Sequence, residues 1–426
     1  MKKLFLLLTV FVCFLAGAQK VNYTFNPVET KFIIGYLASD DLKGRAVFTP
    51  EIDKAANFIA EHFKKAGLKT FNNSENYLQT FAMVSPKLKE LTATINNEKI
   101  AAERVIPITG ARELVVTEKS GYEVMRINAG GNLFREAVAN SQSGKNRIVL
   151  VDSSFADNFK RLTFLSRNFL NTGVSTIFIL GNPGMQHFSI KALQDVSERK
   201  LSNVAGVLPG KSRPDEYVIF SAHYDHMGIG KPENGDSIYN GANDDASGTT
   251  AIMMLADYFA KQDNNARSII FVAFTAEETG GFGSRYFSRV VEPKKVMAML
   301  NIEMIGTESK WGRNSAYITG FDKSNLGEIL QKNLAGSGFN FNPDPYPEQQ
   351  LFYRSDNATL AALGVPAHTI STSKMDNEPY YHKPGDEVKT LDLANMTEII
   401  KSIAISAASI ISAKDTPSRV NTGDLR

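Results

Sequence analysis

Histidine and acidic residues, the residue types that bind zinc, recur in five short motifs of this 426-residue chain. The motifs are SAHYDH with His223, GANDDASG with Asp244, AFTAEE with Glu277 and Glu278, NIEM with Glu303, and YYHKPGDE with His382. Two imidazoles and several carboxylates are what a pair of zinc ions needs when one position must stay open for water. The set therefore predicts a hydrolase that depends on metal.

His223 ends an apolar run and is followed two positions later by Asp225. In an extended chain, residues i and i+2 point the same way. We therefore expect Asp225 to accept a hydrogen bond from the ring nitrogen of His223 that does not bind metal. Taken alone, this HxD pair is equally typical of a structural histidine beside an acid.

Two consecutive aspartates stand between glycines just before a predicted helix. Capping of that helix by Asp245 or Ser247 is expected. Capping needs only one such residue, however, and leaves the second aspartate unexplained. One of the pair, Asp244 by preference, is expected to bridge two metals, because a carboxylate has two oxygens to share.

Glu277 and Glu278 follow the apolar run at 268–274, where adjacent carboxylates repel each other unless a cation compensates. One of them can bind metal while its neighbour takes a proton from the attacking water. Glu303 alone is typical of a surface acid, and His382 alone of a loop histidine. Their recurrence beside the other motifs favours metal ligands. The remaining histidines are predicted to be structural or peripheral, with His226 as a wall residue of the site and the others being His62, His187 and His368.

From Val204 onward, strand-like and helical segments alternate. The predicted strands are Tyr217–Ala222, Ser268–Phe274, Val296–Ile302, Ala316–Thr319 and Val365–Ile370. The predicted helices are Gly248–Lys261, Lys323–Ala335, Asn357–Leu363 and Leu391–Ser412, with one more near the N-terminus at residues 51–66. This rhythm predicts an α/β fold with a mostly parallel central sheet sandwiched by helices, whose active site lies beyond the carboxyl ends of the strands.

A second, smaller domain is predicted within residues 85–195. Short β-like runs alternate there with polar, Gly- and Asn-containing stretches, without a cluster of chemical residues. We expect a β-rich insertion that divides the main domain into residues 19–84 and 196–412. The polar tail at 413–426 is predicted to be disordered.

The N-terminus has the pattern of a secretory signal peptide over residues 1–18. Lys2 and Lys3 precede an apolar run to Leu15, and Ala16-Gly17-Ala18 supplies a cleavage site before Gln19. A retained membrane anchor is the alternative, although the run is short for a span of roughly 20 residues. We expect an exported protein, periplasmic or secreted, without a membrane partner after cleavage.

The composition excludes several kinds of partner. Loss of Lys2 and Lys3 lowers the 47 basic residues to 45, equal to the 45 acidic residues, and no basic run remains. Nucleic-acid or anionic-lipid binding therefore has no electrostatic support. Cys13, the only cysteine, lies within the predicted leader, so stability must come from the core and from metal rather than from disulfides.

Together these motifs resemble the secreted di-zinc aminopeptidases, relatives of bacterial leucyl aminopeptidase, glutamate carboxypeptidase and glutaminyl cyclase. The resemblance covers YLASDDLKGRAVFTPEIDKAANFIAEHFKKAGLK near the N-terminus and resumes from NVAGVLPG to YYHKPGDEVKTLD. The middle segment is similar to a degenerate protease-associated domain through KNRIVLVD and NTGVSTIFILGN. The resemblance implies an exopeptidase of the zinc aminopeptidase type, acting on peptides.

The resemblance also implies individual roles. The first zinc would be bound by His223, which Asp225 orients, and by Glu303. The second would be bound by Glu278 and His382. Asp244 would bridge the two ions, with a cis peptide to Asp245, and Glu277 would be the general base for a water activated by both zincs.

Two positions depart from the family pattern. Glu303 stands where aspartate is commoner, and Asn357 in Ser355-Asp356-Asn357 stands where relatives often have histidine. Three alternatives remain open: a glutaminyl cyclase-type acyltransferase with one zinc, another exopeptidase such as a carboxypeptidase or dipeptidase, and a non-catalytic binding ectodomain.

Overall fold

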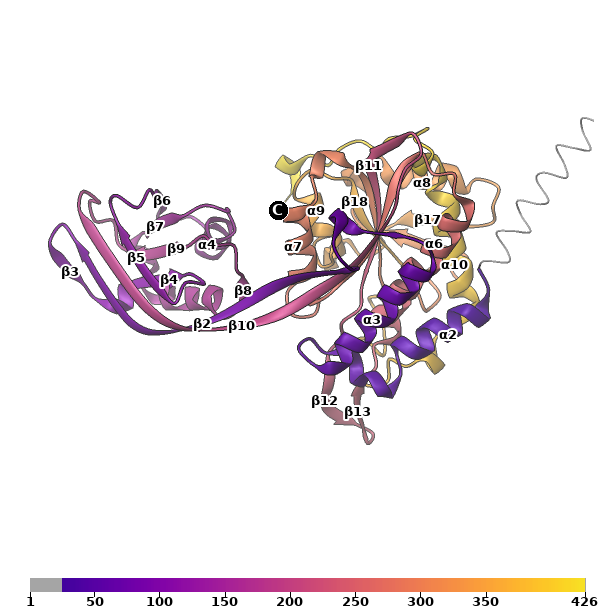
Figure 1. The fold of residues 1–426 in the computed structure, drawn as a ribbon, viewed down its shortest axis with the longest axis horizontal. Helices are drawn as coiled ribbons and strands as arrows, with labels where there is room; N and C mark the ends of the chain where they lie inside the picture. Colours follow the sequence, from indigo (N-terminus) through magenta and orange to yellow (C-terminus); the bar gives the residue numbers. More distant parts are fainter. Residues whose placement is uncertain (1–24, 426) are drawn as a thin grey trace, which may run out of the picture. The chain divides into compact units, whose positions relative to one another are not determined.

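The computed structural model describes residues 25–425, which form two compact units. The first unit comprises the residues up to Thr80 and from Leu201 onward, and the second comprises Phe81–Lys200. Strands β2 (Leu78–Ile95) and β10 (Phe188–Leu208) carry the chain from one unit to the other (Figure 1). The predicted signal peptide at residues 1–18 lies outside the described residues.

The first unit is built on a mostly parallel sheet. Its strands, in spatial order, are β17 (Asn340–Pro343), β16 (Ser315–Ile318), β18 (Ala367–Ser371), β15 (Val296–Ile302), β11 (Arg213–His223) and β14 (Arg267–Phe274), followed by β10. The central neighbours β18, β15, β11 and β14 are parallel, whereas β10 joins β14 antiparallel. The predicted fold class is confirmed, because parallel strands form the centre of this sheet.

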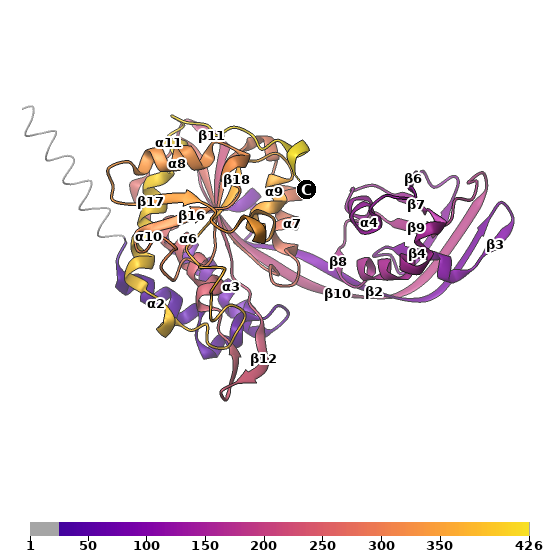
Figure 2. The same cartoon turned by 180° about the vertical axis from the view of Figure 1, so that it is seen from behind.

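Helices cover both faces of this sheet, as Figures 1 and 2 show. The helices are α2 (Pro27–Leu37), α3 (Pro50–Lys65), α6 (Ser247–Gln262), α7 (Phe282–Val290), α8 (Leu326–Leu334), α9 (Asn357–Ala361), α10 (Leu393–Ser406) and α11 (Ala408–Ile411). Alternate strand residues point to opposite faces. Phe220 and Leu300 belong to a core cluster that includes residues of α2, α3, α6, α8 and α10, whereas Ile219 and Met299 belong to a second cluster with residues of α7 and α9.

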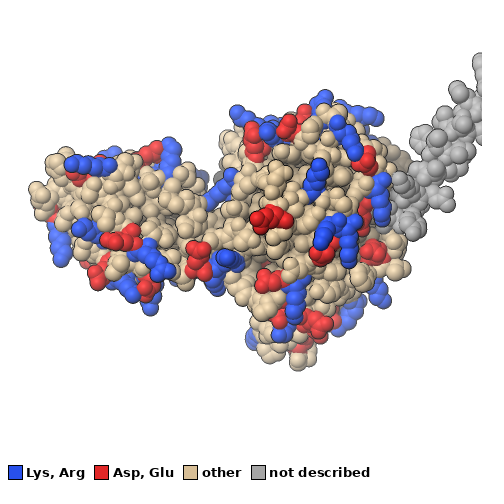
Figure 3. Space-filling model, in the orientation of Figure 1, with Lys and Arg blue, Asp and Glu red and all other residues tan. Residues whose placement is uncertain are grey.

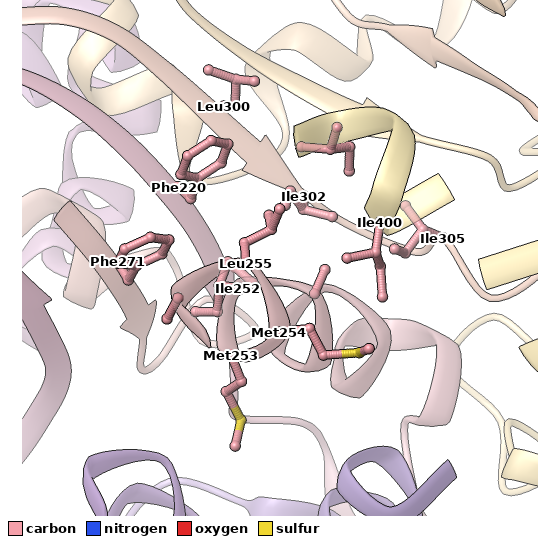
Figure 4. Close-up of a cluster of buried hydrophobic side chains, with 14 of the residues drawn as sticks. Phe220, Ile252, Met253, Met254, Leu255, Phe271, Leu300, Ile302, Ile305 and Ile400 are labelled. Carbon is pink, nitrogen blue, oxygen red and sulfur yellow. The ribbon is translucent and has the colours of Figure 1, made fainter. Parts of the chain in front are cut away.

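Helix α6 lies at the centre of the larger core, and all of its residues from Ser247 to Ala256 are buried. Ile252 and Leu255 lie among Phe220 and Ile302 of the sheet (Figure 4). On another side of the helix, the sulfur of Met254 accepts a hydrogen bond from Thr30 of α2 at 3.4 Å. This burial fixes the N-terminal end of α6, which directly follows the two aspartates.

One long apolar helical stretch of the described chain is also a core element. Leu393–Ile411 is long and apolar enough to cross a membrane by composition, but 67% of it is buried inside the structure. Ile399, Ile400 and Ile403 of α10 belong to the larger core. The apolar character of this stretch is therefore explained by packing.

The second unit contains a four-stranded sheet of its own. Its strands, in spatial order, are β4 (Val105–Ile108), β9 (Thr176–Leu180), β7 (Arg147–Val151) and β6 (Glu123–Ile127). Helix α4 (Leu133–Ser141) packs on one face through Leu133 and Ala137. Strand β5 (Glu113–Thr117) pairs with β10. The unit is β-rich, and its likeness to a protease-associated domain stays a prediction.

Charges of both signs are interspersed on one face of the protein. On the face drawn in Figure 3, Lys and Arg side chains alternate with Asp and Glu side chains on both units. This distribution agrees with the near-zero net charge of the sequence.

Residues 413–425 of the C-terminal tail follow a defined path along the first unit, whereas the sequence led us to predict disorder at residues 413–426. The guanidinium of Arg267 is fully buried and donates to the carbonyl of Asp415 at 2.8 Å and to the hydroxyl of Thr416 at 2.5 Å. Val420 is buried, and its N–H donates to Gly364. A buried guanidinium needs acceptors for its donors, and the polar tail supplies two of them beside Glu216 and the carbonyl of Ile410.

A chain that ends after Lys414 is expected to be less stable than the full chain by roughly 3 kcal/mol, because hydrogen bonds to a buried charged group contribute about 1.5–3 kcal/mol each. Urea denaturation measures this difference. A chain that ends after Asn421 keeps Asp415, Thr416 and Val420, and should unfold close to the full-length protein. Equal stability of the two truncated chains would contradict this account of the tail.

Candidate metal centre

The predicted ligands meet at one edge of the sheet. Strands β11, β14 and β15 are parallel and end at His223, Phe274 and Ile302. Glu303 follows β15 directly, and Glu277 and Glu278 follow β14 within four residues. His223 pairs in register with Phe274. The carboxyl ends of these strands therefore deliver an imidazole and three carboxylates to the same place.

Asp244 lies between the two predicted histidine ligands. One carboxylate oxygen, Oδ1, is 3.1 Å from Nε2 of His223, and the other, Oδ2, is 3.2 Å from Nε2 of His382. Nε2 of His382 is also 3.2 Å from Oε2 of Glu278. Ligands about 2.0–2.1 Å from a tetrahedral zinc are separated by roughly 3.3 Å. The spacing of these donors therefore fits zinc, and each carboxylate oxygen of Asp244 faces a different histidine.

Glu303 completes the group around His223. Ligand atoms of His223, Asp244 and Glu303 all lie within 4.8 Å of one another. The hydroxyl of Ser355 donates to Oε2 of Glu303. The longer side chain that stands where relatives often have aspartate therefore still reaches the centre.

Hydrogen bonds to the backbone fix the loop that carries Asp244. The carboxylate of Asp386 accepts from the N–H groups of Asn243 and Asp244 at 2.8 and 3.0 Å. Asp386 was not predicted as a site residue, although it lies in the same motif as His382. The peptide bond between Asp244 and Asp245 is cis, as the resemblance implied.

Asp245 has a different task from its neighbour. Its carboxylate accepts from the N–H of Gly248 in the first turn of α6, at 2.9 Å, and from the N–H of Met304 at 3.1 Å. Gly248 has no room for a side chain, since a Cβ would lie 2.1 Å from the carbonyl of Ile302. The capping role expected for Asp245 is thus confirmed. The carboxylate of Asp244 faces the two histidines of the metal centre instead.

Asp225 makes a contact other than the one expected. Nδ1 of His223 is 3.1 Å from the backbone carbonyl of Asp225, whereas the carboxylate is 3.8 Å away. The carboxylate instead accepts from the N–H groups of Glu277 and Glu278, at 3.0 and 3.4 Å. The prediction assumed an extended chain, but β11 ends at His223. Asp225 therefore orients the imidazole through its carbonyl and the two glutamates through its carboxylate.

Arg45 is a site residue that the sequence did not reveal. Its guanidinium is fully buried and donates to the carbonyls of Tyr224 at 2.8 Å, Asn240 at 2.6 Å and Gly241 at 2.9 Å. These carbonyls belong to the two loops that follow His223 and precede Asp244. The segment DDLKGR lies within the resemblance, but nothing in its spacing indicates that an arginine would clamp these loops.

Three residues beside the ligands adopt the left-handed backbone region, which non-glycine residues rarely occupy. They are Ala276 at φ 58°, Met304 at φ 54° and His382 itself at φ 55°. Tyr381 stacks on the imidazole of His382 with ring centroids 3.9 Å apart. Such conformations persist only when the surroundings enforce them, and they cluster at functional sites.

Burial and mutual repulsion perturb the acids of the centre. Burial raises the pKa of Glu303 to about 7 and the pKa of Glu277 well above 4.5. Burial also acts to raise the pKa of Glu278, but His226 and His382 outweigh it and lower the pKa to about 2. A site where some acids have a raised pKa and a neighbouring acid has a lowered pKa is typical of a functional site.

Burial acts to lower the pKa of His382, but the carboxylates of Asp244 and Glu278 outweigh it and raise the pKa to about 10. Proton binding by this group stabilises the metal-free fold fully below its ordinary pKa of 6.5, and the contribution is lost as pH rises through 10. We expect the melting temperature of chelator-treated protein to fall between pH 7 and pH 9.

Zinc should flatten this dependence, because metal-bound imidazole is neutral. A His382→Asn variant should flatten it in the absence of metal. Thermal denaturation at several pH values measures both effects. A melting temperature of the metal-free protein that rises from pH 7 to pH 9 would show that the imidazole is not protonated among these acids.

Comparisons with known proteins agree with this geometry. Residues 203–406 match peptidase family M28. A probable zinc metalloprotease of Pyricularia oryzae is 36% identical over 112 residues, 26% of this chain and 22% of that protein. A probable leucine aminopeptidase of Trichophyton verrucosum is 27% identical over 210 residues, 47% of this chain and 55% of that protein. The chain thus spans about half or less of the length of these relatives.

A solved structure extends the likeness to most of the chain. A zinc aminopeptidase from Bacillus subtilis aligns with a TM-score of 0.56 and 17% identity, over 92% of this chain and 97% of that chain. At this identity the likeness concerns the fold alone. The matched segment contains His223, Asp244, Glu303 and His382 among the residues of the centre. Residues 203–406, just under half of the chain, therefore match peptidase family M28.

Proposed function

We propose that this protein is a zinc-dependent aminopeptidase that removes N-terminal residues from peptides. The placement of Asp244 carries the proposal, since its two oxygens face His223 and His382 separately, at 3.1 and 3.2 Å. A single ion would not need a carboxylate held between two histidines. The names of the relatives support zinc and peptide hydrolysis.

Two zinc ions per chain fit the donor set. His223 and Glu303 would hold one ion, Glu278 and His382 the other, and Asp244 both. Bound there, the ions would supply Lewis acidity, lowering the pKa of water and polarising the scissile carbonyl. The buried acids would also need fewer protons, because the cations compensate their charge.

Glu277 is assigned as the general base. Its backbone N–H is fixed by Asp225 at 3.0 Å, and burial raises its pKa, which makes the carboxylate a better proton acceptor. Glu277 takes a proton from water as the oxygen bonds to the carbonyl carbon. It then gives the proton to the amine nitrogen as the C–N bond breaks.

The acidic character of the centre favours a free N-terminus over a C-terminus. Asp225, Asp356 and Asp386 add buried carboxylates around the ligand acids. Such a field attracts an ammonium group and repels a terminal carboxylate. Arg354, exposed near the centre, is the one observation that favours a carboxypeptidase. A panel of free and N-acylated peptides separates the two, and equal cleavage of both would rule out the aminopeptidase.

A pocket beside Glu303 is suited to the side chain of the first residue. It has a free volume of about 50 Å³ and opens to solvent, and apolar lining comes from Met304, Leu351 and Met375, beside the charged Glu303 and Arg354. Two of the hydroxyls that line it are already engaged: that of Tyr317 donates to the carbonyl of Ser373, and that of Ser371 to the carbonyl of Met304. A polar side chain would lose its hydration there, so aliphatic first residues are preferred.

Exported location and peptide substrates complete the proposal. The leader-like N-terminus supports export to the periplasm or the medium, and the balanced surface charge gives no reason to expect a nucleic-acid partner. The cyclase alternative predicts one zinc per chain and cyclisation of glutaminyl peptides. Metal analysis of the purified protein distinguishes it.

A Glu277→Gln substitution is expected to lower kcat by roughly 10²–10⁴-fold, because the amide cannot accept the proton. Zinc content and melting temperature should stay near those of the unchanged protein. Glu292→Gln, at an exposed position, is the matched control and should leave kcat unchanged. A Glu277→Gln protein that keeps zinc and turns over at the original rate would disprove the assignment.

A Leu351→Trp substitution should fill the pocket and lower kcat/KM for a leucyl substrate about tenfold or more relative to an alanyl substrate. The same change at Leu363, which is 50% exposed, provides the control and should leave the ratio unchanged. Rates on aminoacyl-amides measure the ratio. Parallel losses on both substrates would mean that the pocket does not receive the first side chain.

A further inference from the structure

His226 is buried beside Glu278 and His382, the two residues assigned to the second zinc ion. It lies three residues beyond the end of β11, is 2% exposed, and places Nδ1 2.7 Å from Oε1 of Glu278. Its ring also lies edge-on to that of His382, with centroids 5.8 Å apart. The sequence predicted only a wall residue here.

The position of His226 is fixed by a backbone hydrogen bond and by the close approach of Gly241 to its ring. Its N–H donates to the carbonyl of Arg45 at 3.3 Å, and the guanidinium of Arg45 holds the facing loop through Gly241. Gly241 has φ 58°, and a Cβ there would lie 2.5 Å from Cγ of His226. Only glycine lets the loop before Asp244 approach the imidazole this closely.

The polar atoms of this contact are unusual for buried groups. Among the described residues, neither ring nitrogen of His226 has an aligned hydrogen bond, and neither does Oε1 of Glu278, although Nδ1 and Oε1 are in contact. Buried polar atoms without partners are costly and call for an explanation. In metal-free geometries, functional hydrogen bonds are often poorly aligned and tighten only when the site is complete.

The two oxygens of Glu278 are divided between two histidines. Oε2 lies 3.2 Å from Nε2 of His382, a spacing close to the roughly 3.3 Å between two ligands of one zinc. Oε1 lies 2.7 Å from Nδ1 of His226, which is a hydrogen-bond length. Oε2 thus has the spacing of a metal ligand, and Oε1 has the spacing of a hydrogen-bond acceptor.

We propose that His226 is a positioning residue of the second zinc site. Its Nδ1–H donates to Oε1 of Glu278, so that Oε2 faces the ion shared with Asp244 and His382. The inference rests on the two-zinc site of the proposed function. Partners that hold metal ligands in this way typically contribute 10–100-fold to metal affinity.

Stepwise zinc titration of the metal-free protein against a competing chelator tests this role in three variants. His226→Ala removes the donor. His226→Asn keeps an amide donor near the position of Nδ1 but has no atom at the position of Nε2. His62→Asn is the matched control, because His62 makes a similar contact, with Nε2 3.1 Å from Asp257, between α3 and α6.

We expect His226→Ala to bind the first zinc normally and the second 10–100-fold more weakly. His226→Asn should recover most of this loss, and His62→Asn should bind both ions like the unchanged protein. Second-site affinity that is unchanged in His226→Ala would overturn the proposal. So would an equal loss in the Ala and Asn variants, which would make His226 a metal ligand itself or a purely structural residue.

The measurement separates this inference from the proposed function. Unchanged protein that binds two zinc ions but cleaves no peptide would contradict the aminopeptidase and leave the role of His226 standing. Peptidase activity of the unchanged protein, together with unchanged second-site zinc affinity in His226→Ala, would support the aminopeptidase and contradict the role of His226. If His226→Ala does not fold, the Asn variant alone decides, because the proposal requires it to keep the second zinc.

Discussion

Concentrated negative charge at the carboxyl edge of the sheet is the constraint on which the rest of the structure depends. Asp225, Asp244, Asp245 and Asp386 are all buried there, close to the glutamates that follow β14 and β15. Carboxylates held away from water repel one another and raise their own pKa values unless cations or donors compensate. The fold meets this demand with backbone N–H groups for Asp225, Asp245 and Asp386, and leaves Asp244 for histidines and metal.

The compensating groups come from distant parts of the sequence. Arg45 precedes α3, whereas Asp386 lies shortly before α10, and both fix the same loop around Asp244. Rigid support from outside the ligand set is what keeps a functional site within the narrow geometry its chemistry needs. Ala276, Met304 and His382 have left-handed backbone conformations, which shows that the surrounding structure enforces the conformation of this edge.

The sequence predicted the parts of this protein that depend on local pattern. β15 has the predicted bounds, and α6 lies within a residue of its prediction, because buried parallel strands and long helices have strong apolar signals. α2 escaped prediction since Val28 and Phe32 are exposed while Ile33 and Ile34 are buried, which blurs its helical stripe. The ligand residues could be predicted from residue type and strand ends. The roles of Arg45, Asp386 and His226, and the carboxylate contacts of Asp225, depend on loop conformations that no spacing specifies.

The wide separation of Arg45 and Asp386 along the chain has a consequence for biosynthesis. The loop that presents Asp244 is held by groups from both ends of the main unit, so the centre cannot take its final form until residue 386 has left the ribosome. A partly made chain therefore contains most of the ligand residues but does not hold them in their final positions. The ligands therefore reach their final arrangement only after both supporting segments have been made.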